Sequence, residues 1–271
     1  MSRGNFGSKL GIILATAGSA VGLGNVWRFP YMTGQNGGAA FLLVYIGCIL
    51  LLGIPGMLSE FIVGRHGQAN AAKAYDKLSN GRPWKLVGYL GILTATIILG
   101  FYAVIAGWCF EYLFASLAGH TLGDADYIQN YFVEFSSDTW RPLIWGCVFI
   151  GVTHMVIIRG VQKGIESVSK WLMPILMILL LILVGASCSL PNAIDGVRFL
   201  LMPDFSKVDS HVVLEALGQA FFSLSFGIAV LCTYASYFTR ETNLLKSASQ
   251  IAVLDTLIAI LSGLMIFPAA F

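Results

Sequence analysis

Three glycines lie close together in an apolar stretch that also holds an asparagine and an arginine, the run Gly18–Pro30 (GSAVGLGNVWRFP). No charged residue occurs between Leu10 and Trp27, which is typical of a segment that crosses a membrane. Each glycine costs a helix about 1 kcal/mol relative to alanine, so the cluster predicts a break in this helix. Backbone freed inside lipid must face protein or a polar cavity. There, carbonyl groups suit a hard cation and the N-terminus of a restarted helix suits an anion.

Asp255 is the second residue that could do chemistry. It lies nine residues beyond Lys246, as Gly18 lies nine residues beyond Lys9. At about 1.5 Å per residue, both positions are roughly 13 Å inside a hydrocarbon core about 30 Å thick. A carboxylate at that depth costs several kcal/mol unless it is compensated, so we expect Asp255 either to bind a cation or to form a structural pair with another helix.

The composition indicates an integral membrane protein. Hydrophobic residues make up 57% of the chain and charged residues 11%, and the mean hydropathy is +0.79. The sequence has no basic patch of the kind that binds nucleic acid, so nucleic acid is not expected as a partner. The five cysteines have no metal-ligand spacing, and the four histidines lie apart without paired carboxylates, which argues against an enzyme. The sequence indicates nothing about protein partners or oligomeric state.

Apolar runs along the chain predict seven membrane helices in one transmembrane domain covering residues 1–271. Their expected bounds are 8–34 with a break near 18–24, 39–64, 85–118, 140–158, 164–190, 211–239 with a break near 223–228, and 246–271.

Loop charges predict the orientation of these helices. Residues 64–85 carry five lysines and arginines against one acid, whereas residues 119–139 carry four acids and no lysine or arginine. The positive-inside rule therefore predicts a multi-pass protein of the plasma (inner) membrane with a cytoplasmic N-terminus. Because the two breaks lie five helices apart in order, the first and sixth helices would cross the membrane in opposite directions, as an inverted repeat requires.

The glycine-rich run, the second break at Phe222–Gly227 (FSLSFG) and the segment Gly160–Glu166 (GVQKGIE) resemble the neurotransmitter:sodium symporter family. The resemblance covers essentially the whole chain. It implies an all-α integral membrane protein with a broken-helix, five-plus-five inverted-repeat transporter fold, of which only helices 1–7 would be present, the seventh being truncated.

The function implied is a sodium-coupled symporter of a neutral, hydrophobic amino acid that works by alternating access. Two alternatives stay open: a transport-inactive amino-acid sensor, and a non-functional fragment of such a transporter.

By the same resemblance, two sodium ions are expected. The first sodium site would use Ala20, Asn25, Ser223 and Asp255, and the second would use the carbonyl groups of Gly18 and Val21. Many family members have asparagine where Asp255 stands.

The substrate site implied by the resemblance is mostly apolar. Its members would be Ala20, Gly22, Leu23, Gly24, Ile98, Tyr102, Phe222, Ser223, Ser225, Phe226 and Ile228. The backbone N–H groups of Leu23 and Gly24, with the Tyr102 hydroxyl, would bind the substrate carboxylate, and Phe222 would cover it. Members that carry monoamines have aspartate where Gly22 stands, so this substrate should bring its own carboxylate.

The resemblance to the family also implies gate residues. Arg3, Phe6, Arg28 and Tyr237 match gate positions, and Arg28 would need an acid from a tenth helix. Glu60 matches a glutamate that binds the unwound part of helix six, although an interfacial charge is an equal alternative.

Chloride-dependent relatives bind the anion with a tyrosine, a glutamine and serines. Tyr45, Gln219 and Ser223 match three of these ligands, but Ala259 replaces the serine of helix seven. Because Asp255 would add a fixed negative charge beside them, we expect that chloride is not required.

Overall fold

The computed structural model describes residues 9–271 and is helical throughout its regular structure. The chain divides into two compact units. Unit 1 comprises residues 9–92 and Val161–Phe271, and unit 2 comprises Leu93–Gly160.

Unit 1 holds both glycine-rich interruptions. Its elements are α1 (Lys9–Ala20), η1 (Gly24–Arg28), α2 (Phe29–Gln35), α3 (Ala39–Cys48), η2 (Ile49–Gly53), α4 (Ile54–Gly67), α5 (Ala71–Leu78), the beginning of α6 (Lys85–Leu117), η3 (Val161–Glu166), α9 (Ser167–Cys188), α10 (Ala193–Leu201), η4 (Phe205–Lys207), α11 (Ser210–Leu224), α12 (Val230–Ala235) and α13 (Leu244–Ala270). Unit 2 holds the rest of α6, with α7 (Ala125–Ser137) and α8 (Arg141–Ile158).

The first break follows α1, where the chain bends at Val21 and Gly22 before the π-helical turn η1. The second lies between Leu224 and Val230. There Ser225, Gly227 and Ala229 have φ angles of +54°, +87° and +60°. Such angles are free for glycine but cost energy for serine and alanine, so other contacts must hold this segment. These non-helical residues overlap the break that the sequence predicts near 223–228.

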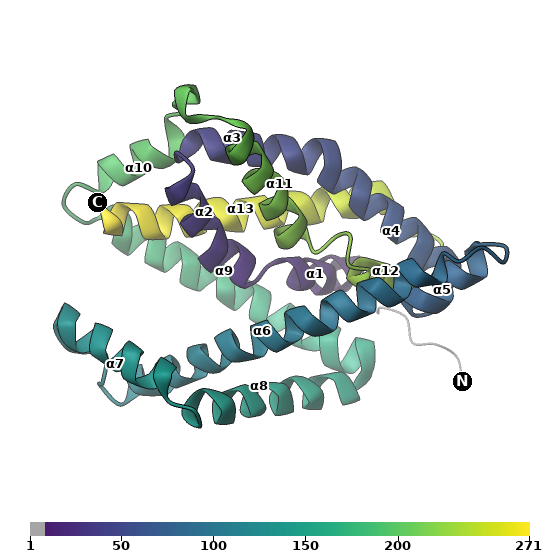
Figure 1. The fold of residues 1–271 in the computed structure, drawn as a ribbon, viewed down its shortest axis with the longest axis horizontal. Helices are drawn as coiled ribbons and strands as arrows, with labels where there is room; N and C mark the ends of the chain where they lie inside the picture. The colour runs from purple at the N-terminus through teal and green to yellow at the C-terminus, as the bar shows by residue number, and fades with distance from the viewer. Residues whose placement is uncertain (1–8) are drawn as a thin grey trace. The chain divides into compact units, whose positions relative to one another are not determined.

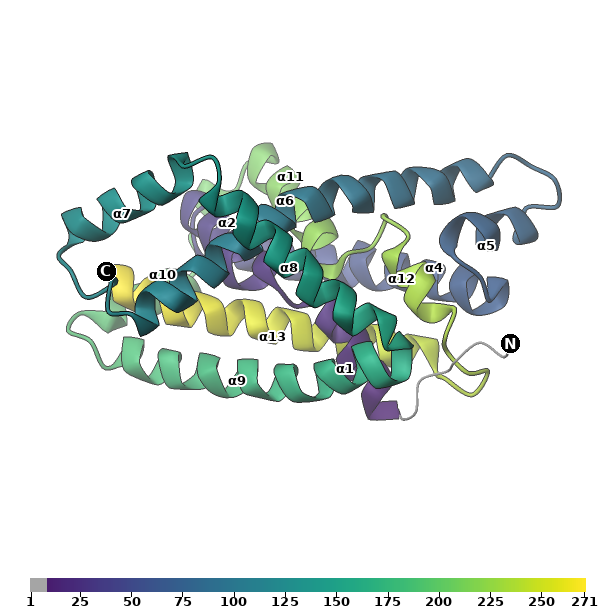
Figure 2. The same ribbon diagram turned by 90° about the horizontal axis from the view of Figure 1, so that it is seen from below.

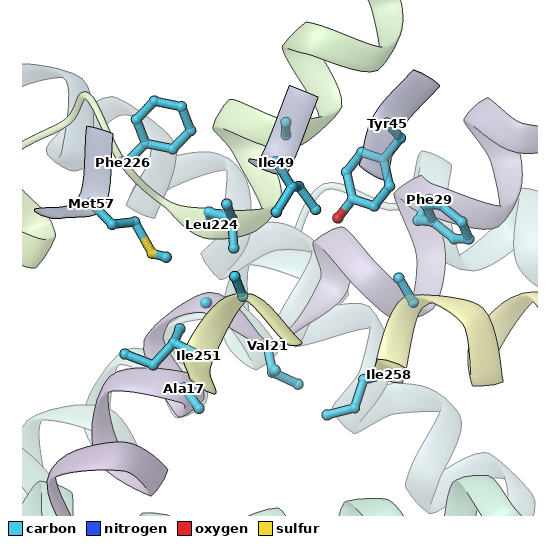
Figure 3. Close-up of a cluster of buried hydrophobic side chains, with 14 of the residues drawn as sticks. Ala17, Val21, Phe29, Tyr45, Ile49, Met57, Leu224, Phe226, Ile251 and Ile258 are labelled. Carbon is cyan, nitrogen blue, oxygen red and sulfur yellow. The ribbon is translucent and has the colours of Figure 1, made fainter. Parts of the chain in front are cut away.

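Helix α13 forms the middle of unit 1. It packs against α4 on one side and α9 on the other, and also against α1, η1, α2 and α10. Figure 1 shows α13 (yellow) between α4 and α9, and Figure 2 shows α9 running along it. Ile251 and Ile258, seven residues apart on one face of α13, are both buried in the hydrophobic core. Figure 3 shows these two side chains with Ala17 and Val21 of the first broken helix.

Five helical stretches of the described chain are long and apolar enough to cross a membrane: Ala39–Gly67, Lys85–Leu117, Arg141–Ile158, Lys163–Cys188 and Leu244–Ala270. The two remaining apolar segments are divided by their breaks into pieces too short to qualify individually. Large apolar side chains such as Leu51 and Ile182 point outward, as expected for a surface in contact with lipid.

Three shorter helices lie between the predicted membrane helices: α5, α7 and α10. Asn70 begins α5 and Asp124 begins α7, each with a side-chain oxygen that accepts a hydrogen bond from a backbone N–H in the first turn.

Within unit 2, the buried carboxylate of Glu111 in α6 connects this helix with α7 and α8. It accepts hydrogen bonds of 2.5 Å from the Tyr131 hydroxyl and 2.5 Å from the Trp145 ring nitrogen. Arg141 also donates to it and forms an ion pair. Where α8 begins, the backbone N–H groups of Arg141 and Trp140 hold the pKa of Asp138 below its usual range.

Candidate cation and substrate site

The carboxylate of Asp255 lies at the point where four separate elements meet. Oδ1 accepts a hydrogen bond of 2.8 Å from Asn25, while Oδ2 accepts one of 2.7 Å from Ser223 and one of 3.2 Å from Tyr45. These side chains come from η1, α11 and α3, and Asp255 from α13. All four residues are fully buried.

The charge of this cluster has no basic partner among residues 9–271. The ion pairs found there involve other acids, and each donor to Asp255 is neutral. Ionised carboxylates that are fully buried need compensation, because the desolvation penalty is several kcal/mol. Carboxylate, hydroxyl and amide oxygens are ligands that hard cations prefer. The donor set at Asp255 therefore fits a small cation.

Asn25 joins this cluster to the first break. Its Nδ2 group donates to Oδ1 of Asp255, to the Asp255 backbone carbonyl at 3.0 Å and to the Ser223 hydroxyl at 3.0 Å. Its Oδ1 accepts a hydrogen bond of 3.1 Å from the backbone N–H of Gly22. One asparagine thus satisfies the polar backbone of the bend and orders the carboxylate of α13.

A second polar chain lies above the first break. Arg28 donates a hydrogen bond of 2.5 Å to the Gln219 side chain, which in turn donates one of 3.0 Å to the Gly24 carbonyl. The Arg28 guanidinium also lies 4.9 Å from the centre of the Phe222 ring, a distance at which cation–π attraction operates. An amide and an aromatic ring therefore contact Arg28. The acid expected for it from a tenth helix stays a prediction.

Glu60 holds the second break. Its two carboxylate oxygens accept hydrogen bonds of 2.6 Å from the backbone N–H of Gly227 and 3.0 Å from that of Cys232. Only 5% of this residue is exposed. These contacts satisfy backbone groups that the break frees and stabilise the positive φ angles there. Of the two interpretations of Glu60, the structure supports the one that ties it to helix six.

The residues expected to bind substrate divide between the two units. Gly22, Leu23 and Gly24 lie one residue beyond the end of α1, and a Cβ atom at Gly22 would have no described atom within 4 Å. On α11 and the segment after it lie Phe222, Ser223, Ser225, Phe226 and Ile228.

Ile98 and Tyr102 lie on the part of α6 that belongs to unit 2, so their place in this site stays a prediction. The carbonyl groups of Gly18 and Ala20 lie at the end of α1 and that of Val21 directly after it, and their role in ion binding stays a prediction as well. Tyr237 packs at the edge of the core after α12. The gate positions Arg3 and Phe6 lie outside the described residues.

Several contacts of the site were not predicted. Gln219 was matched only to an anion ligand, although it connects Arg28 with the first break. The glycines of η2 and α4 that lie against helix six, Gly53, Gly56 and Gly64, were not predicted either. Their spacing of three and four residues, shared with Glu60, was the available signal.

Comparison with known proteins gives consistent results. Residues 3–139 and 125–270 match the model of the sodium:neurotransmitter symporter family. An uncharacterized sodium-dependent transporter, YhdH of Bacillus subtilis (strain 168), is 43% identical over 267 residues, which are 97% of this chain and 59% of YhdH. The sodium-dependent serotonin transporter of Drosophila melanogaster is 30% identical over 305 residues, with 98% of this chain and 48% of the transporter covered.

Among solved structures, the crystal structure of MhsT in complex with L-phenylalanine is similar. It has a TM-score of 0.93 and 47% identity, and the match covers 100% of this chain and 62% of that chain. The chain therefore spans less than two thirds of the length of each of these relatives.

Proposed function

Because the chain belongs to the sodium:neurotransmitter symporter family, we propose that it acts in sodium-coupled symport of a neutral, hydrophobic amino acid by alternating access. The family is one of transporters rather than enzymes. The observation that carries the proposal is the Asp255 carboxylate, buried among neutral donors from three other elements. We place the protein in the plasma membrane with its N-terminus in the cytoplasm, on the basis of its loop charges.

Sodium is one cargo of the proposed symporter. The first ion would bind Asp255, the Ser223 hydroxyl, the Asn25 side chain and the Ala20 carbonyl, and a second would use the carbonyls of Gly18 and Val21. Asn25 now turns its NH₂ group to Asp255, and a cation would repel that group. We propose that on sodium binding the Asn25 amide turns to present Oδ1 to the ion and gives up its hydrogen bond with Gly22.

This exchange connects the ion to the substrate. Gly22 precedes Leu23 and Gly24, whose N–H groups would receive the substrate carboxylate. When Asn25 releases the Gly22 N–H, the bend that holds these groups is free to adjust to a substrate. Ion and substrate then bind with a reciprocal coupling free energy, typically about 1–3 kcal/mol.

The proposed substrate is a zwitterion with an uncharged side chain. The residues expected around the side chain, Ile98, Ser225, Phe226 and Ile228, carry no charge. Burial of an unpaired ionic side chain among them would be costly. No side chain at Gly22 competes with a substrate carboxylate. The phenylalanine bound to MhsT supports the same substrate class.

We further propose that transport does not require chloride. Tyr45 and Ser223, which match chloride ligands of relatives, both donate to Oδ2 of Asp255. Two of the three matched donors are therefore already engaged by a carboxylate, and the third, Gln219, donates to the Gly24 carbonyl. A second anion about 4 Å from it would add roughly 4 kcal/mol of repulsion at an effective dielectric of 20. Ala259, fully buried in α13, offers no compensating donor.

Competition for uptake tests the substrate assignment. The full gene product would be reconstituted, and sodium-driven uptake of radiolabelled phenylalanine would be challenged with amino acids and their decarboxylated amines. Neutral hydrophobic amino acids should compete, and phenethylamine should compete at least about tenfold more weakly because it lacks the carboxylate. An amine that competes as well as its parent amino acid would overturn the roles of Leu23, Gly24 and Tyr102.

A further inference from the structure

The second membrane helix (helix two: α3, η2 and α4) has one face that fits against the second broken helix (helix six: α11 and α12). Gly53, Gly56, Glu60 and Gly64 recur at intervals of three and four residues, which places them on one side of the η2–α4 segment. A Cβ atom at Gly53 would lie 2.6 Å from Leu224, and one at Gly64 would lie 2.1 Å from the Cys232 carbonyl. Between them, Glu60 binds the backbone of the break.

Gly56 is the member of this face that contacts an expected pocket residue. A Cβ atom at Gly56 would lie 2.5 Å from Cδ2 and 2.7 Å from Cε2 of Phe226. The Phe226 ring is 5% exposed and stacks on Phe221, with ring centres 4.1 Å apart. Figure 3 shows Phe226 on the same side of the core as Met57, the residue after Gly56. The ring therefore lies against bare backbone on one side and a second aromatic ring on another.

A methyl group at Gly56 would force the ring to move by roughly 1 Å, because carbon atoms in contact are about 3.5–4.0 Å apart. Phe221 stacks on the same ring. We take the displaced ring to shift away from helix two, toward the place where the substrate side chain is expected.

We propose that Gly56 is a specificity-determining residue: by leaving room for the Phe226 ring against helix two, it lets the pocket admit bulky aromatic side chains. This inference rests on the proposed function, because Phe226 is taken as part of the substrate pocket. Gly56 itself acts through Phe226 and need not touch the substrate.

Gly56→Ala tests the inference in the full gene product, with Gly47→Ala as the matched control. Gly47 lies in α3, which belongs to the same membrane-spanning stretch, Ala39–Gly67. A Cβ atom there has no described atom within 4 Å. Sodium-dependent binding would be measured by displacement with phenylalanine and with alanine. Gly56→Ala should lower the phenylalanine-to-alanine affinity ratio about tenfold or more, since one methylene in a tight apolar pocket is worth that much. Gly47→Ala should leave the ratio unchanged.

An unchanged ratio in a folded Gly56→Ala protein would overturn the inference. If that variant does not fold, Gly56→Ala in a Phe226→Leu background is compared with Phe226→Leu alone. With no ring to displace, the two should have equal ratios, and a difference would show that Gly56 acts by another route. Absence of any sodium-dependent amino-acid binding in the unmodified protein would instead refute the proposed function.

Discussion

The hydroxyl group of Ser223 donates a hydrogen bond of 2.7 Å to Asp255, which joins the last turn of α11 to the buried face of α13. The same hydroxyl accepts a hydrogen bond from Asn25 at the first break. Ser223 is thus a shared contact of both breaks and of the buried charge. A change in the charge at Asp255 would therefore alter the hydrogen bonds of both interrupted helices.

Replacement of Asp255 by alanine should weaken sodium-dependent substrate binding at least about tenfold, because it removes the formal negative charge from the proposed ion site. Sodium titration of phenylalanine binding to the full gene product measures this. Membrane insertion should be intact. Asp195→Ala is the control, since Asp195 is an exposed acid of α10 that pairs with Arg198. Undiminished sodium affinity in Asp255→Ala would show that Asp255 is a structural pair.

Exchange of chloride for gluconate on both sides of the membrane should leave the initial rate of sodium-driven uptake within about twofold. The reason is that Asp255 already provides the anion that balances the sodium charge. A large loss of rate in gluconate would contradict this prediction.

The double change Asp255→Asn with Ala259→Ser should make uptake depend on chloride. Asparagine removes the repelling charge, and serine adds a hydroxyl donor at the position that chloride-dependent relatives use. The single changes serve as controls, and each should be less responsive to chloride than the double variant. If the double variant binds sodium but ignores chloride, another carboxylate balances the charge, and Glu60 would be tested next.

Glu60→Ala should destabilise the protein, because it leaves the N–H groups of Gly227 and Cys232 without their partner. A buried N–H group without a partner costs about 1–3 kcal/mol, so the two together cost about 2–6 kcal/mol. Thermal unfolding of the detergent-purified protein measures the loss. Glu60→Gln, which keeps one acceptor oxygen, should lose less, and Ser59→Ala on the exposed side should match the unmodified protein. Equal unfolding temperatures for Glu60→Ala and Ser59→Ala would disprove the role.

The sequence contained enough to predict where the helices break. Three clustered glycines and an acid inside an apolar run, such as Asp255, are local signals, because the free-energy cost of each can be judged without knowledge of its neighbours. Glu60 was different: its charge alone could not distinguish a membrane interface from a buried partner. Its hydrogen bonds to Gly227 and Cys232 depend on the packing of α4 on α12.

Contacts across the bundle could not be predicted from spacing. The link from Arg28 through Gln219 to the Gly24 carbonyl joins residues nearly 200 positions apart. The role of Gly56 depends on the position of the Phe226 ring, which the non-helical backbone sets. Helices such as α7 were missed because their polar residues resemble those of a loop.

The most direct test of sodium-coupled symport is accumulation of radiolabelled phenylalanine by vesicles that contain the full gene product. With a sodium gradient directed inward, the internal concentration should rise above the external one. It should return to equilibrium when a sodium ionophore collapses the gradient, and it should not rise when potassium replaces sodium. Binding of phenylalanine without accumulation under the sodium gradient would contradict symport and indicate a transport-inactive sensor or a non-functional protein instead.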